Sequence, residues 1–470
     1  MQIPILSGVF TDGGPDVRTQ YPVNLIPVPL ESGISGGYLR PADGLIQTGV
    51  GPGVTRGGIE WRGVCYRVMG PSLVSVAVDG TVTTIGTVSG AGDVTPVTMD
   101  FSFDRLAIAV SGQLWYYDES TLSQVTDVDL GVCVDMIFID GYFMTTDGEF
   151  LVVTDLNDPT AVDPTKYGSS EINPDPVVAL LRLRNEAWAL NRNTIEGFDN
   201  VGGVGFPFAR IEGAQIQVGC IGTHACCVFN ETIAFVGSAA NSAPGIFLAA
   251  NASARKISTS EIDRLLSTYT ELELSQTFVE TRNDNAHQHL YVHLIDRTLV
   301  FDAAASAALD VAVWSVLTSS VVGFSQYRGQ HFVWAYDRWL VGDPGSTSVG
   351  EVSQTVSSHF GSVVRWEFGT TALYNQSKGA IVNSLELVAL TGRVAIGDDS
   401  PLISTSYSLD GVSWSQDHTI SVGAVGDRLK RLIWWRQGMM RSLRMQRFRG
   451  DSTAHVSFAR LEATLTPLEF

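Results

Sequence analysis

The chain has 470 residues, of which 44% are hydrophobic and 17% are charged, so it can easily build a sizeable core. Its formal net charge of −19 argues against a protein that grips nucleic acid through the phosphates, because such binding needs an excess of Lys and Arg. An acidic wall is still compatible with a channel through which DNA slides without sticking.

The amino-terminal residues are not expected to act as a targeting signal. The stretch MQIPILSGVFTDGG has no basic region, and its apolar run is too short for a signal peptide. Nowhere does the sequence approach the ~20 uninterrupted apolar residues of a membrane helix. We therefore expect synthesis in the cytoplasm and no membrane insertion.

An apolar, proline-rich stretch follows at residues 21–44, YPVNLIPVPLESGISGGYLRPADG. Pro22, Pro27 and Pro29 each remove a backbone donor and favour extended geometry in the preceding residue. This pattern predicts neither a helix nor a central strand. We expect residues 1–55 to form an extended N-terminal arm with the first strands, and residues 21–44 to pack along the following domain or onto a neighbouring subunit.

Residues 56–358 fall into units of roughly 30 to 60 residues, each with short alternating strands and turns rich in Gly, Asp or Asn. The first unit, residues 63–88, contains an Asp79-Gly80 hairpin signal. Such spacing predicts an all-β fold, a β-propeller of about seven blades. The alternative is two ordinary β-sandwiches without rotational symmetry.

One stretch of this region has helical periodicity. In residues 257–275, Ser258 and Glu261 have the spacing of a capping box, and apolar residues follow at helical intervals. We expect a short amphipathic helix on the rim of a blade.

Residues 359–470 read as the strands of a separate antiparallel β-sandwich. Within them, Ser408–Trp414, SLDGVSW, approximates the Asp-box hairpin of sialidase propellers but is one residue short and occurs once. An ordinary hairpin is the simpler interpretation, since no arginine cluster or nucleophile pair for a glycosidase is evident.

The segment 428–449, RLKRLIWWRQGMMRSLRMQRFR, is strongly basic in an acidic chain. It carries eight basic residues and no acid, so the remaining residues carry −27. Arg, Trp and Met are enriched in the cores of protein interfaces. Three interpretations remain open: a nucleic-acid strip, a subunit or partner interface, and a solvated sheet face; the composition favours the second.

No catalytic or metal-binding motif is evident. His287, His289 and His293 share one strand face, but no carboxylate or cysteine at supporting spacing accompanies them. The five cysteines have neither disulfide-framework nor metal-ligand spacing. The sequence therefore predicts a protein that is not an enzyme and has no metal and no cofactor.

The opening arm resembles the amino-terminal signature of the packaged-DNA stabilisation proteins of short-tailed double-stranded DNA phages, also called tail hub, nozzle or tail accessory factor proteins. The matching residues are Tyr21, Pro22, Val23, Asn24, Gly37, Tyr38, Leu39, Arg40 and Gly44. Weaker matches follow in order at residues 150–180, 193–203 and 299–314, and the basic carboxy-terminal strand also has a counterpart. The resemblance spans nearly the whole chain.

The resemblance implies a structural virion protein of the phage tail, without a cofactor or catalytic residue. Family members form a hexameric ring below the portal and head-to-tail adaptor, closed by a needle or plug and flanked by tailspikes or tail fibres. The ring retains packaged double-stranded DNA and conducts it during ejection, without tight sequence-specific binding. Alternatives are a carbohydrate-binding or sialidase-like propeller and a generic protein-binding scaffold propeller.

The candidate partner-contacting residues come from the arm and from the basic segment. They are Tyr21, Pro22, Asn24, Tyr38, Arg40, Arg428, Lys430, Arg431, Trp434, Trp435, Arg436, Arg441, Arg444, Arg447 and Arg449.

Overall fold

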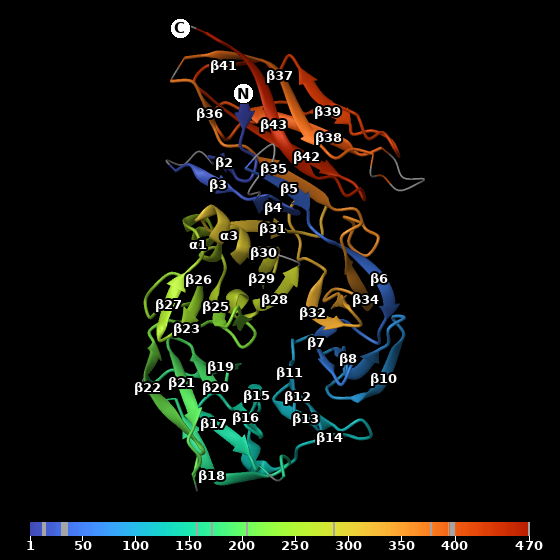
Figure 1. Ribbon diagram of the computed structural model, residues 1–470. Helices are drawn as coiled ribbons and strands as arrows, with labels where there is room; N and C mark the ends of the chain where they lie inside the picture. Colours follow the sequence, from blue (N-terminus) through green and yellow to red (C-terminus); the bar gives the residue numbers. More distant parts are fainter. Residues whose placement is uncertain are drawn as a thin grey trace.

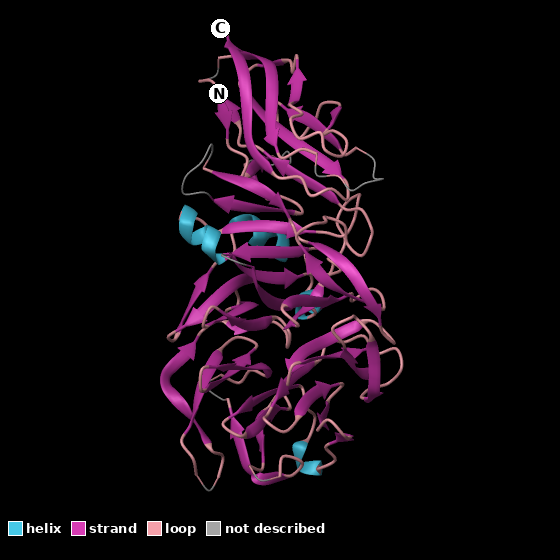
Figure 2. Cartoon of the chain, turned by 45° about the vertical axis from the view of Figure 1, so that its right-hand side comes forward, coloured by secondary structure: helices cyan, strands magenta, loops and turns pink. Residues whose placement is uncertain are grey.

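The structure is a computed structural model that describes residues 1–11, 16–29, 36–156, 158–170, 173–203, 205–284, 287–376, 378–392, 394 and 400–468. A ring of β-sheets forms one end of the molecule, and a two-sheet sandwich that holds both chain termini forms the other (Figure 1). Nearly all regular structure is strand (Figure 2). Among the described residues, no helix is both long enough and apolar enough to cross a membrane.

The described part of the ring contains seven sheets, which confirms the predicted propeller. Blade one comprises β7 (Thr55–Trp61), β8 (Val64–Met69), β9 (Ser72–Val76) and β10 (Val82–Thr87). Blade two comprises β11 (Thr98–Phe101), β12 (Leu106–Val110), β13 (Gln113–Tyr117) and β14 (Leu122–Gln124). Blade three comprises β15 (Asp135–Ile139), β16 (Tyr142–Thr146), β17 (Phe150–Thr154) and β18 (Val162–Ser169), preceded by the 3₁₀ turn Val128–Leu130.

The remaining blades continue around the ring. Blade four comprises β19 (Val177–Leu183), β20 (Glu186–Asn191), β21 (Ile195–Asn200) and β22 (Phe208–Ile216). Blade five comprises β23 (Gly219–Cys220), β24 (Cys226–Phe229), β25 (Thr232–Ser238), β26 (Gly245–Ala250) and β27 (Ser253–Lys256). Blade six comprises β28 (Phe278–Asp284), β29 (His287–His293), β30 (Thr298–Asp302) and β31 (Val313–Leu317).

Blade seven joins distant parts of the chain, since β32 (Gln330–Ala335), β33 (Arg338–Gly342) and β34 (Ser348–Ser353) pair with β6 (Gly44–Val50) from the amino-terminal region. The strand β6 therefore closes the ring. Apolar side chains of neighbouring blades meet between their sheets; Trp61 and Tyr66 of blade one, for example, pack with Leu106 and Ile108 of blade two. The core of the ring therefore lies mainly between the blades, because each sheet packs against a neighbouring sheet on both of its faces.

The sandwich is built from both ends of the chain. Its larger sheet runs β4 (Leu25–Pro29), β5 (Gly37–Pro41), β43 (Phe458–Pro467), β37 (Ala380–Ala389) and β40 (Leu432–Trp435), with β1 (Gln2–Ile3) and β41 (Met439–Met440) paired alongside. The smaller sheet runs β35 (Arg365–Gly369), β42 (Leu443–Asp451), β38 (Leu402–Ser408) and β39 (His418–Ser421), with β36 (Leu373–Tyr374) beside β42. A separate hairpin pairs β2 (Gly8–Phe10) with β3 (Arg18–Gln20).

The proline-rich arm is extended, as predicted, but it is not a free arm. It forms the antiparallel pair β4–β5, and β5 lies inside the sheet between β4 and β43, which corrects the expectation that the segment supplies no internal strand. Pro27 and Pro29 lie in β4 at the sheet edge, where a missing N–H donor costs no ladder hydrogen bond. Residues 30–35 of the arm lie outside the described residues.

The single predicted helix is two short helices. These are α1 (Ser260–Leu266), capped by Thr259 rather than Ser258, and α2 (Glu271–Ser275), where Thr270 and Glu273 form the capping box. A third helix, α3 (Ala303–Leu309), follows Asp302 in blade six, and the Asp302 side chain accepts a hydrogen bond from Ala305 N. The SLDGVSW segment is a tight hairpin turn in the sandwich, in which the Asp410 carboxylate accepts from the backbone N–H groups of Val412 and Ser413.

Candidate functional site

The YPVN segment is the joint between the two domains. Val23 exchanges backbone hydrogen bonds with Glu367 of the sandwich, with N···O distances of 2.8 and 3.1 Å. On the other side, Asn24 N donates to Val316 O of blade six, and Val316 N donates to Pro22 O. Residues 22–24 therefore act as a short strand that links the outermost strand of blade six to the sandwich.

The side chain of Asn24 closes this joint. Its Nδ2 donates to Thr318 O at 2.8 Å and to Arg365 O at 2.7 Å, and its Oδ1 accepts from Thr318 N at 3.0 Å. Asn24 is 5% exposed and has a φ of 51°, a left-handed conformation that Asn tolerates better than most residues. The Asn24 side chain therefore forms hydrogen bonds with three backbone groups, Thr318 N, Thr318 O and Arg365 O. Most other polar residues would need more free energy to adopt the left-handed backbone conformation from which it does so.

The other arm residues also contact the chain's own propeller or sandwich. Tyr21 packs against the apolar core of blades four to six, and its hydroxyl contacts Thr259 Oγ1 at the start of α1. Burial raises the pKa of Tyr21 to about 12. Pro22 is buried, and Tyr38 is half-buried within β5. These contacts support intramolecular docking of the arm, one of the two outcomes expected from the sequence.

Arg40 lies in a buried network of charges between the arm and blade six. It pairs with Asp43 at 2.7 Å and with Asp284, while Arg282 of β28 pairs with Asp43 at 2.5 Å. Burial alone would raise the pKa of Asp43, but the guanidinium groups of Arg282 and Arg40 hold it below its usual value. The Arg40 side chain is therefore committed to fixing the arm on the propeller.

The basic segment divides into exposed and buried residues. The exposed members are Arg428, Arg431, Trp435, Arg436, Arg441 and Arg449; Lys430 and Arg447 are half-buried, and Trp434 and Arg444 are buried. Arg444 is fully buried in the sandwich, where it donates to Gln437 O and to Gln446 Oε1 and lies 3.9 Å above the Tyr407 ring. Burial lowers its pKa to about 10. Trp434 and Arg444 therefore stabilise the domain, and neither is accessible to a partner.

Four exposed residues in and around β41 form what we call the basic end surface: Trp435, Arg436, Met439 and Arg441. Trp435 is 67% and Met439 is 45% exposed, although both lie in sheet strands, β40 and β41. Arg431 forms a two-pronged ion pair with Glu386, whereas Arg428, Arg436 and Arg441 make no ion pair with a described residue. The strand β41 lies at the end of the sandwich away from the ring (Figure 1), whereas Arg428, beside Gly392, lies past the opposite end of β37.

Buried carboxylates connect the inner strands around the axis of the ring, and the sequence analysis missed them. Asp100 accepts from Phe138 N of the next blade at 2.7 Å, and Asp135 accepts from Leu180 N of the blade after that at 2.7 Å. Glu280 accepts from the backbone N–H groups of two residues of β32. Burial raises the pKa of Asp135 to about 6. A single Asp or Glu in an otherwise apolar strand, such as Asp135 in DMIFI, is the sequence pattern that could have indicated a buried carboxylate.

Two of these carboxylates line an axial cavity of about 540 Å³. Asp135 and Glu280 reach it together with His224, Cys227 and His331. Both carboxylates accept hydrogen bonds from backbone N–H groups of the next blade and so join neighbouring blades.

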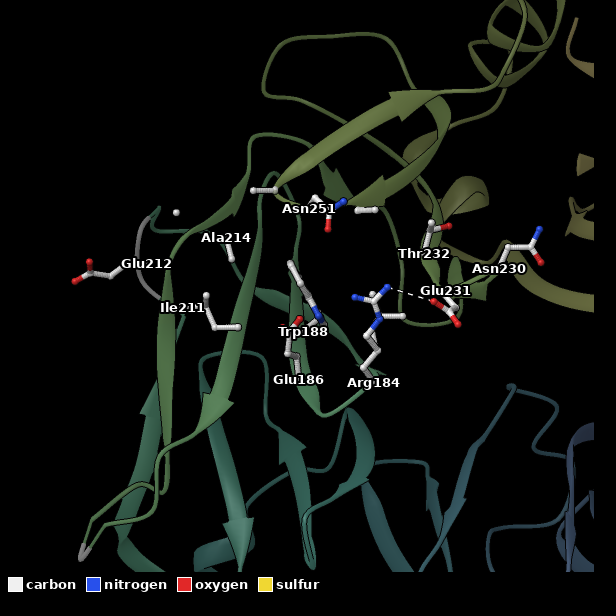
Figure 3. A pocket seen from close by; sticks show the side chains of 14 residues that line it. Arg184, Glu186, Trp188, Ile211, Glu212, Ala214, Asn230, Glu231, Thr232 and Asn251 are labelled. Atoms are coloured by element: carbon white, nitrogen blue, oxygen red, sulfur yellow. Dashed lines mark hydrogen bonds and ion pairs between the residues drawn. The ribbon is translucent and has the colours of Figure 1, made fainter. Parts of the chain in front are cut away.

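A second hollow, of about 420 Å³, lies between blades four and five (Figure 3). Arg184 and Glu231 form an ion pair across its mouth at 3.2 Å. Trp188 lines it but is only 5% exposed, so its ring offers little surface for stacking on a sugar. This hollow lacks the exposed aromatic platform that the carbohydrate-binding alternative would use.

The histidine strand requires a correction. The strand pattern predicts no carboxylate at supporting spacing for His287, His289 and His293, but β30 places Asp302 directly opposite His289 in the sheet. His287, His289 and Asp302 bring ligand atoms within 4.8 Å of one another. Spacing along one strand could not reveal this neighbour, because it comes from the next strand across a turn.

Comparisons with known proteins cover nearly the whole chain. The family model described as bacteriophage P22 Gp10, β-propeller, matches residues 1–357, and the one described as bacteriophage P22 Gp10, β-sandwich, matches residues 365–466. The tail hub protein gp10 of Salmonella phage P22 is 27% identical over 465 residues, which cover 94% of each chain.

Solved structures resemble the propeller only loosely. The Neurospora crassa Pan2 WD40 domain covers 66% of this chain and 95% of its own at 13% identity, with a TM-score of 0.44. Virginiamycin B lyase from Staphylococcus aureus covers 64% and 94% at 9% identity, with a TM-score of 0.40. Neither carries a functional argument. The two consecutive family matches do, and the chain belongs to the bacteriophage P22 Gp10 family of phage tail hub proteins, structural components of the virion tail that assemble with other tail proteins.

Proposed function

We propose that this chain forms a ring, expected to be a hexamer, below the portal and head-to-tail adaptor of a short tail, and that the ring extends the DNA channel. A needle or plug closes the channel, tailspikes or fibres attach at its side, and the ring retains packaged DNA until ejection. The chain performs no catalysis in this role. The observation that carries the proposal is the match of both family models, in order, over residues 1–357 and 365–466.

Two structural features support this role. The joint at residues 22–24 connects the sandwich to the propeller through backbone hydrogen bonds. The net charge of −19 gives a surface that repels DNA, so a channel built from it would let DNA pass without adhesion.

The test is cryo-electron microscopy of phage particles together with a DNA-retention assay. We expect density for this chain around the channel below the adaptor, and full heads that lose their DNA when the chain is absent. Particles that keep their DNA without the chain, or that carry it away from the channel, would contradict the proposal.

The basic end surface is the partner contact that we propose for assembly. Its unpaired arginines suit the acidic surface of a neighbouring subunit, and the exposed Trp435 and Met439 supply apolar contact area. We expect the double variant Arg436→Glu/Arg441→Glu to fold normally but to fail to add to the tail. The matched control, Arg184→Glu/Arg255→Glu, changes the net charge equally at exposed propeller positions. Incorporation, measured on purified particles, should be lost in the first variant only; equal incorporation of both would exclude this surface.

A further inference from the structure

His289 is a buried side chain whose ring nitrogens form no hydrogen bond of good geometry with a described residue, although Nε2 lies 3.5 Å from the Asp302 carboxylate. The side chain is 1% exposed. Burying an imidazole without partners costs free energy, because its nitrogens lose their hydrogen bonds to water. Such a group in a native protein needs a physical explanation.

A second buried histidine on the same strand shows the contrast. His293 is 2% exposed, and both of its ring nitrogens are satisfied: Nδ1 by Thr298 Oγ1 and Nε2 by Glu280 Oε1, each at 2.9 Å. The local fold therefore can satisfy a histidine in full. At His289 it leaves both nitrogens open beside a carboxylate and a second imidazole.

Those neighbours are Asp302 and His287. The Asp302 Oδ2 atom lies 2.5 Å from His287 Nδ1 and 3.5 Å from His289 Nε2. The other oxygen, Oδ1, accepts from Ala305 N and so fixes the carboxylate at the start of α3. Two imidazole nitrogens and one carboxylate oxygen thus converge from β29 and the end of β30.

The charges around this cluster permit a cation. Arg40 and Arg282 lie nearby, but Asp43 and Asp284 pair with them. Together with Asp302, these ionised groups leave one net negative charge when both imidazoles are neutral.

We propose that His287, His289 and Asp302 bind a divalent transition-metal ion such as Zn²⁺. Two imidazoles and one carboxylate form a ligand set that borderline metals such as zinc accept, with water in the remaining coordination position. The half-buried His287, 16% exposed, leaves a path for the ion and for that water. The ion stabilises blade six where the charge network of the arm meets it.

The test uses the full chain, stripped with a chelator and titrated with Co²⁺ and then with Zn²⁺. We expect about one Co²⁺ per chain with visible d–d absorption, displacement of the Co²⁺ by Zn²⁺, and a thermal midpoint that rises with Zn²⁺ concentration. Binding should weaken at acid pH, because the imidazoles must be neutral to act as ligands.

Three variants make the result specific. His287→Asn removes a half-buried ligand with little risk to folding, and His289→Asn removes the buried one; each should abolish the absorption and the Zn²⁺-dependent rise in midpoint. His418→Asn is the matched control at an exposed histidine outside the cluster, and it should bind as the wild type does. Failure of the wild-type chain to take up Co²⁺, or uptake that survives in His287→Asn, would overturn the proposal. If His289→Asn does not fold, the His287 comparison decides alone.

Discussion

Replacing Asn24 by Ala tests the joint between the domains. The substitution removes all three side-chain hydrogen bonds and leaves Thr318 N, Thr318 O and Arg365 O without that partner. Each buried group left unpaired costs roughly 1–3 kcal/mol, and Ala at a φ of 51° adds about 1 kcal/mol. Allowing for partial access of water to these groups, we expect a loss of about 4 kcal/mol in the apparent free energy of unfolding.

The assay is urea denaturation followed by tryptophan fluorescence, with calorimetry to show whether the two domains unfold together. Asn24→Gly separates the causes, because Gly accepts the left-handed backbone but restores no hydrogen bond, so most of the loss should persist. The matched control is Asn251→Ala at an exposed Asn with a φ of 50°, which should cost only about 1 kcal/mol. A loss at Asn24 no larger than that at Asn251 would refute the reasoning.

Three further predictions concern ring closure, the buried arginine and the inner carboxylates. Gly49→Ala places a methyl group 2.0 Å from a backbone oxygen of blade one, so it should weaken the pairing of β6 and lower the thermal midpoint of unfolding. The control Gly90→Ala, with open space around its Cβ, should leave the midpoint unchanged. Equal midpoints for the two variants would contradict this prediction. Arg444→Glu buries an unpaired carboxylate and should cost about 3–5 kcal/mol, while Arg441→Glu should leave the circular-dichroism melt unchanged. Burial raises the pKa of Asp135 to about 6, above its unfolded value, so its ionisation opposes folding as the pH rises. Relative to Asp135→Asn, the wild-type protein should lose about 2 kcal/mol in its free energy of unfolding from pH 4 to pH 7. Parallel pH profiles of the unfolding free energy for the two proteins would contradict this explanation.

The sequence predicts local features of this fold well, because they depend on neighbouring residues. The Asp79-Gly80 turn joins β9 to β10, with Gly80 at a φ of 85°, as the hairpin signal indicates. The prolines of the arm mark an extended segment that lies at a sheet edge. By contrast, β5 pairs on its other side with β43, whose residues begin at Phe458, and no local pattern encodes a pairing over that separation.

In the basic segment, strand alternation could have predicted from the sequence that Arg444 is buried. Arg444, Gln446 and Phe448 alternate along β42, so they share one face of the strand, and Phe448 marks that face as the buried one. Counting positive charges therefore groups Arg444 with Arg449, although strand alternation sends their side chains to opposite faces. The cluster around His289 differs, since its third member, Asp302, depends on the register between β29 and β30, which spacing within one strand does not reveal.

Strands from distant parts of the chain share one sheet in the sandwich and one in blade seven, so neither sheet can be completed until late in synthesis. At the ribosome, β5 emerges more than 400 residues before its neighbour β43, an interval of roughly 20–80 s at ordinary translation rates. During that time the apolar hairpin has no sandwich to join, and β6 waits for β34. Only a polypeptide that has been translated through β43 can bury the apolar surfaces of the β4–β5 hairpin. Prematurely terminated products should therefore aggregate, be sensitive to proteases and fail to enter a tail.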